Sequence, residues 1–143
     1  MELSVQDLEF SYRSDSPVFH SVSFKAENSG IFCILGPNGI GKSTLLKCIV
    51  RFLNPHKGEV KIDGKNIKNF SRRELAPLIA YVPQTHTPTF PFSVTDVVSM
   101  GRTAYLGHFA SPGHSDIEKA LFCLSEVGIE HLKDRPYTEL SGG

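Results

Sequence analysis

The chain has 143 residues, of which 40% are apolar and 21% are charged, and its 15 lysines and arginines balance 15 aspartates and glutamates. This length corresponds to about one domain, and the apolar share is enough to build a buried core. A net charge of zero excludes binding to nucleic acid or to an anionic membrane that is driven by overall charge.

No stretch has the pattern of a targeting or membrane-spanning segment. The N-terminus, Met1-Glu2-Leu3, lacks a basic region followed by a long apolar run, so it does not resemble a secretory signal. No run approaches the ~20 apolar residues that a membrane-spanning helix needs. We therefore expect no direct membrane insertion.

The cysteines and histidines predict neither a disulfide framework nor a metal site. Cys33, Cys48 and Cys123 each lie in an apolar run and are expected to be small buried side chains in a reducing cytosol. The six histidines show no metal-ligand spacing.

Strands dominate the expected elements of the first half. Residues 3–10 and 18–26 read as strands, and the second places Val18, His20, Val22, Phe24 and Ala26 on one face. The apolar run 31–35 predicts a strand buried on both faces. A glycine-rich loop, 36–41, then leads into a helix over 42–53 that Asn54-Pro55 is expected to end.

Short elements and then helices follow. Residues 59–62 predict a strand with a hairpin-type turn at Asp63-Gly64. Ser71 and Glu74 form the pattern of a capping box, and 78–82 predicts another strand. The proline-rich stretch around 85–92 predicts a loop.

Two helices are expected after that loop, over 93–100 and from Ser115, with Glu118 as the capping partner of Ser115 and Gly128 as the stop. The expected apolar face of the second helix comprises Ile117, Ala120, Leu121, Leu124 and Val127. Strands followed by helices, with a glycine loop between strand and helix, indicate an α/β fold.

Residues 36–43, GPNGIGKS, fit the P-loop pattern of two glycines, a lysine and a serine or threonine. Glycines let successive backbone N–H groups turn toward phosphate oxygens, and the helix that begins here adds its positive end. Lys42 supplies a full charge to the outer phosphates. Ser43 offers a hydroxyl to Mg²⁺, and Thr44 reaches an inner phosphate. The motif predicts nucleotide binding.

Three segments in order resemble the ABC ATPases. Residues 36–44 (GPNGIGKST) are similar to the Walker A segment, 81–84 (YVPQ) to the Q-loop, and 140–143 (LSGG) to the first four residues of the signature motif. The resemblance covers the whole chain. It implies a P-loop NTPase core with an N-terminal antiparallel β part (1–84) and the start of a helical subdomain (85–143).

The resemblance also implies residue roles. ATP and Mg²⁺ are the expected cofactors, with Lys42 and Gln84 as catalytic residues and Ser43 and Gln84 at the metal. Ser141, Gly142 and Gly143 would contact the nucleotide of a second, identical subunit, and a membrane-spanning permease would be the other partner. The expected nucleotide-binding residues are Tyr12, which resembles the family's adenine-stacking aromatic, and Gly36, Pro37, Asn38, Gly39, Ile40, Gly41, Lys42, Ser43 and Thr44.

Residues 91–102 and 127–135 resemble the ATPases that power import of iron-siderophore, haem or cobalamin chelates. A protein of this type is cytoplasmic and peripheral on the cytoplasmic face of the membrane. No four apolar residues are followed by Asp-Glu, the family's Walker B pattern, and its switch histidine is also missing. We therefore expect a chain truncated within the signature motif that does not hydrolyse ATP alone. The alternatives are a non-hydrolysing nucleotide-binding fragment and a soluble ABC ATPase outside transport.

Overall fold

The computed structural model describes residues 1–13, 16–27, 30–84, 90–107 and 110–140. Two compact units divide the chain, Met1–Ile79 and Ala80–Gly143, and each is described by itself. The predicted division of the nucleotide-binding domain at 84/85 stays a prediction.

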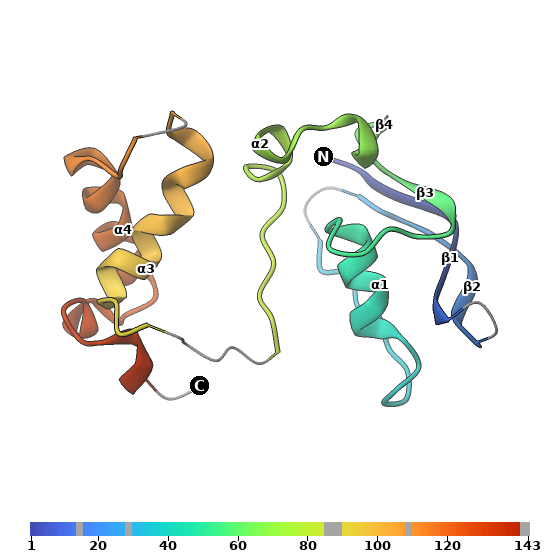
Figure 1. Ribbon diagram of the computed structural model, residues 1–143, viewed down its shortest axis with the longest axis horizontal. Helices are drawn as coiled ribbons and strands as arrows, with labels where there is room; N and C mark the ends of the chain where they lie inside the picture. The colour runs from blue at the N-terminus through green and yellow to red at the C-terminus, as the bar shows by residue number, and fades with distance from the viewer. Residues whose placement is uncertain (14–15, 28–29, 85–89, 108–109, 141–143) are drawn as a thin grey trace. The chain divides into compact units, whose positions relative to one another are not determined.

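The first unit is built on an antiparallel sheet with the order β2-β1-β3-β4. Its strands are β1 (Leu3–Arg13), β2 (Ser16–Ala26), β3 (Lys57–Ile62) and β4 (Lys65–Asn66). α1 (Lys42–Ile49) lies against one face of this sheet (Figure 1). Side chains of β1, β3 and α1 form the core, among them Val5, Leu8, Val60, Leu45 and Cys48. Burial of these apolar side chains is the main term that holds α1 on the sheet.

Two short helices complete this unit: η1 (Ile67–Asn69) and α2 (Arg72–Leu75). The capping box predicted at α2 is confirmed, because Ser71 Oγ accepts from the Glu74 N–H and Glu74 Oε2 accepts from the Ser71 N–H. The turn between β3 and β4 is also as predicted, with positive φ at both Asp63 and Gly64.

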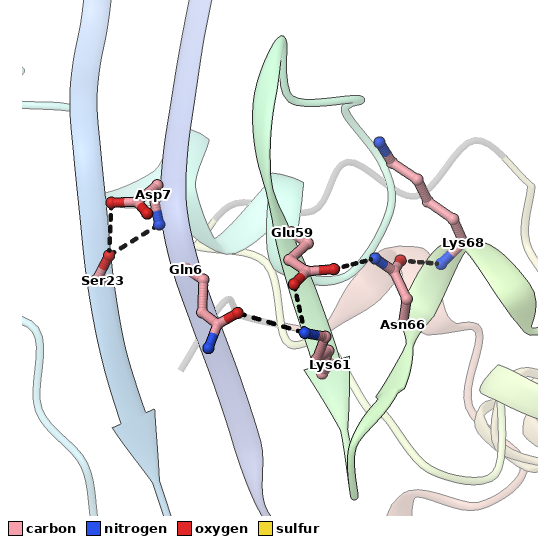
Figure 2. Close-up of polar contacts among 7 residues, drawn as sticks. All are labelled: Gln6, Asp7, Ser23, Glu59, Lys61, Asn66 and Lys68. Carbon is pink, nitrogen blue, oxygen red and sulfur yellow. Dashed lines mark hydrogen bonds and ion pairs between the residues drawn. The ribbon is translucent and has the colours of Figure 1, made fainter.

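The face of the sheet opposite the core carries a continuous set of polar contacts, which Figure 2 shows. The Lys61 ammonium donates to Gln6 Oε1 (3.3 Å) and to the Glu59 carboxylate. Asn66 Nδ2 donates to Glu59 Oε2 (3.0 Å), and the Lys68 N–H donates to Asn66 Oδ1 (2.9 Å). The Lys61 hydrogen bond, followed by that of Asn66, lowers the pKa of Glu59. The network links β1, β3, β4 and η1 through side chains.

Irregular positions interrupt the pairing of β1 with β2. Asp7 and Ser21 both have φ of 45°, and the register shifts between Val5 and Leu8 and again between Leu8 and Phe10. The Asp7 N–H donates to Ser23 Oγ at 2.8 Å across the two strands (Figure 2). The even alternation predicted for 18–26 is therefore wrong at its start: Phe19 packs on the core, whereas His20 is exposed.

The apolar runs 31–35 and 78–82 were expected to be strands, and this is wrong, since none of these residues lies in a strand or a helix. Ile31 is 94% exposed and Leu35 89%. A strand buried on both faces needs a paired strand on each side. Within the described residues, the four-stranded sheet pairs with neither run. Cys33 is exposed for the same reason.

The helix predicted over 42–53 ends earlier, at Ile49, and not at Asn54-Pro55. Arg51 adopts a left-handed conformation (φ 62°), and the Phe52 N–H donates to Lys47 O at 2.8 Å. This is a Schellman ending. The Arg51 guanidinium fixes it by donating to the carbonyls of Ile67 (2.9 Å) and Phe70 (2.6 Å).

The second unit contains α3 (Val94–Met100), η2 (Gly101–Tyr105), α4 (His114–Glu126), η3 (Glu130–Leu132) and η4 (Tyr137–Glu139). α3 and α4 pack side by side (Figure 1). Gly128 ends α4 with φ of 74°, as predicted. The predicted Ser115–Glu118 cap is wrong, because the helix begins one residue earlier and Asp116 Oδ2 accepts from the Gly113 N–H (3.1 Å).

The predicted apolar face of α4 is only partly buried. Ala120 and Leu124 are buried against the rest of the unit, whereas Ile117 and Val127 are exposed. Cys123, which was expected to be buried, is also exposed.

Candidate functional site

The glycine loop 36–41 ends where α1 begins. Gly39 and Gly41 have φ of 83° and 103°, a region that favours glycine. A Cβ added at Gly41 would lie 2.6 Å from Val18 Cγ1, so the loop packs closely on the start of β2. No side chain caps the first turn of α1, and that turn contains no acidic residue. The first N–H groups of α1 and its positive end are therefore suited to an anion.

The lysine at the start of this helix folds back over the loop. Lys42 Nζ donates to Gly36 O and to Pro37 O, both at 2.8 Å. Pro37 O also accepts from the Ile40 N–H (3.5 Å), and Asn38 lies in the exposed turn between them. The ammonium is thus held beside the backbone that bends around it.

Two hydroxyl groups follow the lysine. Ser43 is exposed in the first turn of α1, whereas Thr44 is buried. Tyr12 Oη and Thr44 Oγ1 lie 3.3 Å apart, within hydrogen-bond distance. The structure therefore brings Tyr12, from the end of β1, to the phosphate loop's helix, although 32 positions separate it from Thr44.

Tyr12 is 64% exposed, and its ring makes an edge-to-face contact with Phe10 (centroids 5.0 Å apart, planes at 88°). A flat, exposed aromatic ring beside a phosphate loop can stack on a nucleobase.

The remaining predicted site residues lie outside the first unit, and their roles stay predictions. Gln84 is exposed and belongs to the second unit, which is described by itself. Ser141, Gly142 and Gly143 lie outside the described residues. In the described part of the chain, no three His, Cys, Asp or Glu side chains are placed to share a metal ion.

Sequence reasoning missed His56, which contacts the three residues before Tyr12. The signal was available in principle: His56 immediately precedes a strand that pairs with β1, so the register of that pair would have located it.

Cys48, in α1, is a core residue as predicted, and burial raises the pKa of its thiol to about 11. It therefore stays protonated and is not a nucleophile at neutral pH.

These parts define a P-loop nucleotide-binding protein: positive-φ glycines, a lysine folded on the loop, and hydroxyls in the first turn of the helix. A model of the ABC transporter family matches residues 19–143. The chain therefore belongs to the ABC transporter ATP-binding family and has its P-loop NTPase fold. Among the described residues, we find no helix that combines the length and apolarity needed to cross a bilayer.

Two relatives and one solved structure illustrate the similarity. The chain is 44% identical over 143 residues to an uncharacterized ABC transporter ATP-binding protein of Haemophilus influenzae. It is 41% identical over 144 residues to a probable iron chelatin transport ATP-binding protein of Helicobacter pylori. It is similar, at 32% identity and a TM-score of 0.75, to an inward-facing ABC transporter described as of the metal-chelate type, with 98% of this chain and 51% of that chain covered.

Both relatives are matched over 100% of this chain but over only 54% and 56% of their own length. The chain thus spans about half the length of the curated relatives it matches.

Proposed function

We propose that this chain is the ATP-binding part of an ABC transporter subunit that powers import of a metal chelate. The observation that carries the nucleotide site is the position of Lys42, whose ammonium lies on two loop carbonyls at the positive end of α1. A P-loop lysine in this position can exchange its carbonyl partners for phosphate oxygens.

The residues around Lys42 fit ATP with Mg²⁺. In our proposal the loop 36–41 and the first N–H groups of α1 hold the phosphates, Ser43 is a ligand of Mg²⁺, and Thr44 contacts an inner phosphate. Tyr12 supplies a stacking surface for adenine. The metal ion, when bound, neutralises charge on the phosphates. The absence of acidic side chains from the first turn of α1 supports this arrangement, because a carboxylate there would repel the ligand.

We propose that residues of the second unit make the contacts outside the loop. Gln84 would touch the metal and the attacking water, and Ser141, Gly142 and Gly143 would contact the nucleotide of a second copy. A membrane-spanning permease would be the other partner, and it would hold the subunit on the cytoplasmic face. The relative named for iron chelatin transport and the metal-chelate-type structure support a metal chelate as cargo. In our proposal this is an iron-siderophore, haem or cobalamin chelate.

A second candidate is nucleotide binding without hydrolysis by this chain. Phosphoryl transfer to water needs a group that positions the water as well as charge stabilisation. Within these 143 residues no apolar run precedes an Asp-Glu pair. In this second candidate the 143 residues by themselves would bind the nucleotide without turnover.

Calorimetry with Mg-ATP tests both candidates. Wild type is compared with Lys42→Ala and with Lys47→Ala, which removes a basic side chain from the last turn of the same helix. A hydrogen-bonded charge contributes about 1.5–3 kcal/mol, so Lys42→Ala should weaken binding at least about tenfold. Lys47→Ala should leave it unchanged. Equal affinity in all three proteins would refute the phosphate site.

Phosphate release, measured in parallel, separates the candidates. Release by wild type that is lost in Lys42→Ala supports an active ATPase. Binding without release supports the second candidate.

A further inference from the structure

His56 contacts three consecutive residues of β1 that lead to Tyr12. Its backbone N–H donates to Glu9 O at 2.9 Å, and its ring Nε2 lies 2.9 Å from Ser11 O. A carbonyl oxygen only accepts, so the proton of the imidazole is on Nε2. The ring also stacks on Phe10, with centroids 5.7 Å apart and planes at 24°. One residue outside the sheet therefore fixes the segment 9–11.

Strand pairing does not supply these contacts. β3 pairs with β1 no further along the chain than the Glu9–Lys57 position. On the other side of β1, Ser11 lies opposite Pro17 of β2, but the Ser11 carbonyl oxygen faces His56. The imidazole thus provides a hydrogen bond to the last part of β1, beyond the point where the pairing of β1 with β3 ends.

His56 restrains Tyr12 through two neighbouring residues, Ser11 and Phe10. Tyr12 follows Ser11 directly, so the hydrogen bond to Ser11 O restrains the backbone from which its side chain extends. Phe10, held between the His56 ring and the Tyr12 ring, restrains the ring itself through an edge-to-face contact. The Thr44 hydroxyl holds the far end of the same side chain.

We propose that His56 is a positioning residue that fixes the Tyr12 ring as a stacking surface for the base of the bound nucleotide. This rests on the proposed function, since it requires a nucleotide on the loop. An ordered ring loses less conformational freedom when the base stacks on it, and this strengthens binding. The base would depend on His56, whereas the phosphates, held by Lys42 and the loop, would not.

The test compares ATP with inorganic tripolyphosphate, which has the phosphates but no base. Both are titrated into the full chain with Mg²⁺ by calorimetry. The variants are His56→Ala, His56→Gln, Tyr12→Ala and the double variant His56→Ala/Tyr12→Ala. His20→Ala is the matched control, because this exposed histidine of β2 lies near the Glu9 carboxylate (3.8 Å).

Base stacking on an aromatic ring accounts for about five- to 150-fold in affinity, so partial loss of order in Tyr12 should raise the Kd of ATP about fivefold in His56→Ala. The Kd of tripolyphosphate should change by less than about twofold, and this also shows that the variant is folded. His56→Gln, which keeps a side-chain N–H donor, should recover part of the loss. His20→Ala should match wild type with both ligands.

The double variant decides between positioning and a general structural role. If His56 acts through Tyr12, adding His56→Ala to Tyr12→Ala should have no further effect on ATP binding. Equal loss for ATP and tripolyphosphate, a full additional loss in the double variant, or unchanged ATP affinity in His56→Ala or Tyr12→Ala would each overturn the inference while leaving the phosphate site intact. Failure of wild type to bind either ligand would overturn it together with the proposed function.

Discussion

Gly58 and Gly64 allow the cost of a close backbone approach to be measured apart from that of an unusual backbone conformation. Their φ angles are 79° and 78°. A Cβ added at Gly64 would meet nothing within 4 Å, whereas at Gly58 it would lie 2.3 Å from Gln6 O and 2.4 Å from Asp7 O. Gly58→Ala and Gly64→Ala therefore share the same backbone strain and differ in the clash.

The magnitudes follow from these two terms. A left-handed conformation costs an L-residue about 1–2 kcal/mol, and Gly64→Ala should lose only that. At Gly58 the opposing atoms belong to the backbone of β1, so no side-chain rotation relieves the contact and the strands must separate. Overpacking of this kind adds about 1–3 kcal/mol, which gives about 2–5 kcal/mol in total for Gly58→Ala.

Urea unfolding followed by far-ultraviolet circular dichroism measures both changes. The difference in midpoint multiplied by the mean slope gives the loss in free energy of unfolding. A domain of ordinary stability has about 5–15 kcal/mol, so the larger loss would be readily visible. Equal losses for the two variants would refute the reasoning, because they would mean that β1 and β3 do not approach as closely at Gly58 as the structure has them.

Two further predictions concern ionisable side chains. Hydrogen bonds from Arg102 Nε (3.0 Å) and then from the Gly113 N–H lower the pKa of Asp116. The stabilisation by this carboxylate is thus present above the ordinary aspartate pKa of about 3.9 and lost as the pH falls through the lower folded value. Thermal midpoints of wild type should exceed those of Asp116→Asn at pH 7 and approach them at about pH 2; a constant gap would contradict this. At pH 8 a chromogenic disulfide reagent should label the exposed Cys33 and Cys123 in the native protein and Cys48 only after unfolding, because Cys48 is buried and its thiol pKa is raised to about 11. Immediate reaction of all three cysteines would show that the packing of α1 on the sheet does not shield Cys48.

Local patterns in the sequence predicted the features that depend on neighbouring residues. The Ser71–Glu74 capping box, the Asp63-Gly64 turn, the glycine loop and the Gly128 stop all follow from chemistry within a few positions. Each is specified by backbone conformations or side-chain hydrogen bonds among near neighbours in the sequence, and the structure has each of them.

The failures involve contacts between distant segments. The run 31–35 can form a strand only if other strands pair with it. The β-propensity of its own residues does not show whether such strands are present. The irregular pairing near Ser21, which turns Phe19 inward, arises from the register of two strands. Arg51 ends α1 by reaching carbonyls 16 and 19 positions away.

In the candidate site, too, the local features were predicted from the sequence and the contacts between distant segments were not. The loop and its lysine were predictable because the motif is continuous. The support of Tyr12 by Phe10 and His56 was not predicted, since it depends on how β1 pairs with β3, the strand that His56 precedes.

The irregular pairing of β2 also affects how the sheet meets other chains. β2 forms one border of the described sheet, where unpaired N–H and C=O groups could template a strand from another molecule. Pro17 cannot donate, Ser21 breaks the regular spacing of donors and acceptors, and the exposed Lys25 adds charge. An incoming strand would find only short stretches in register, so this border is protected against edge-to-edge aggregation.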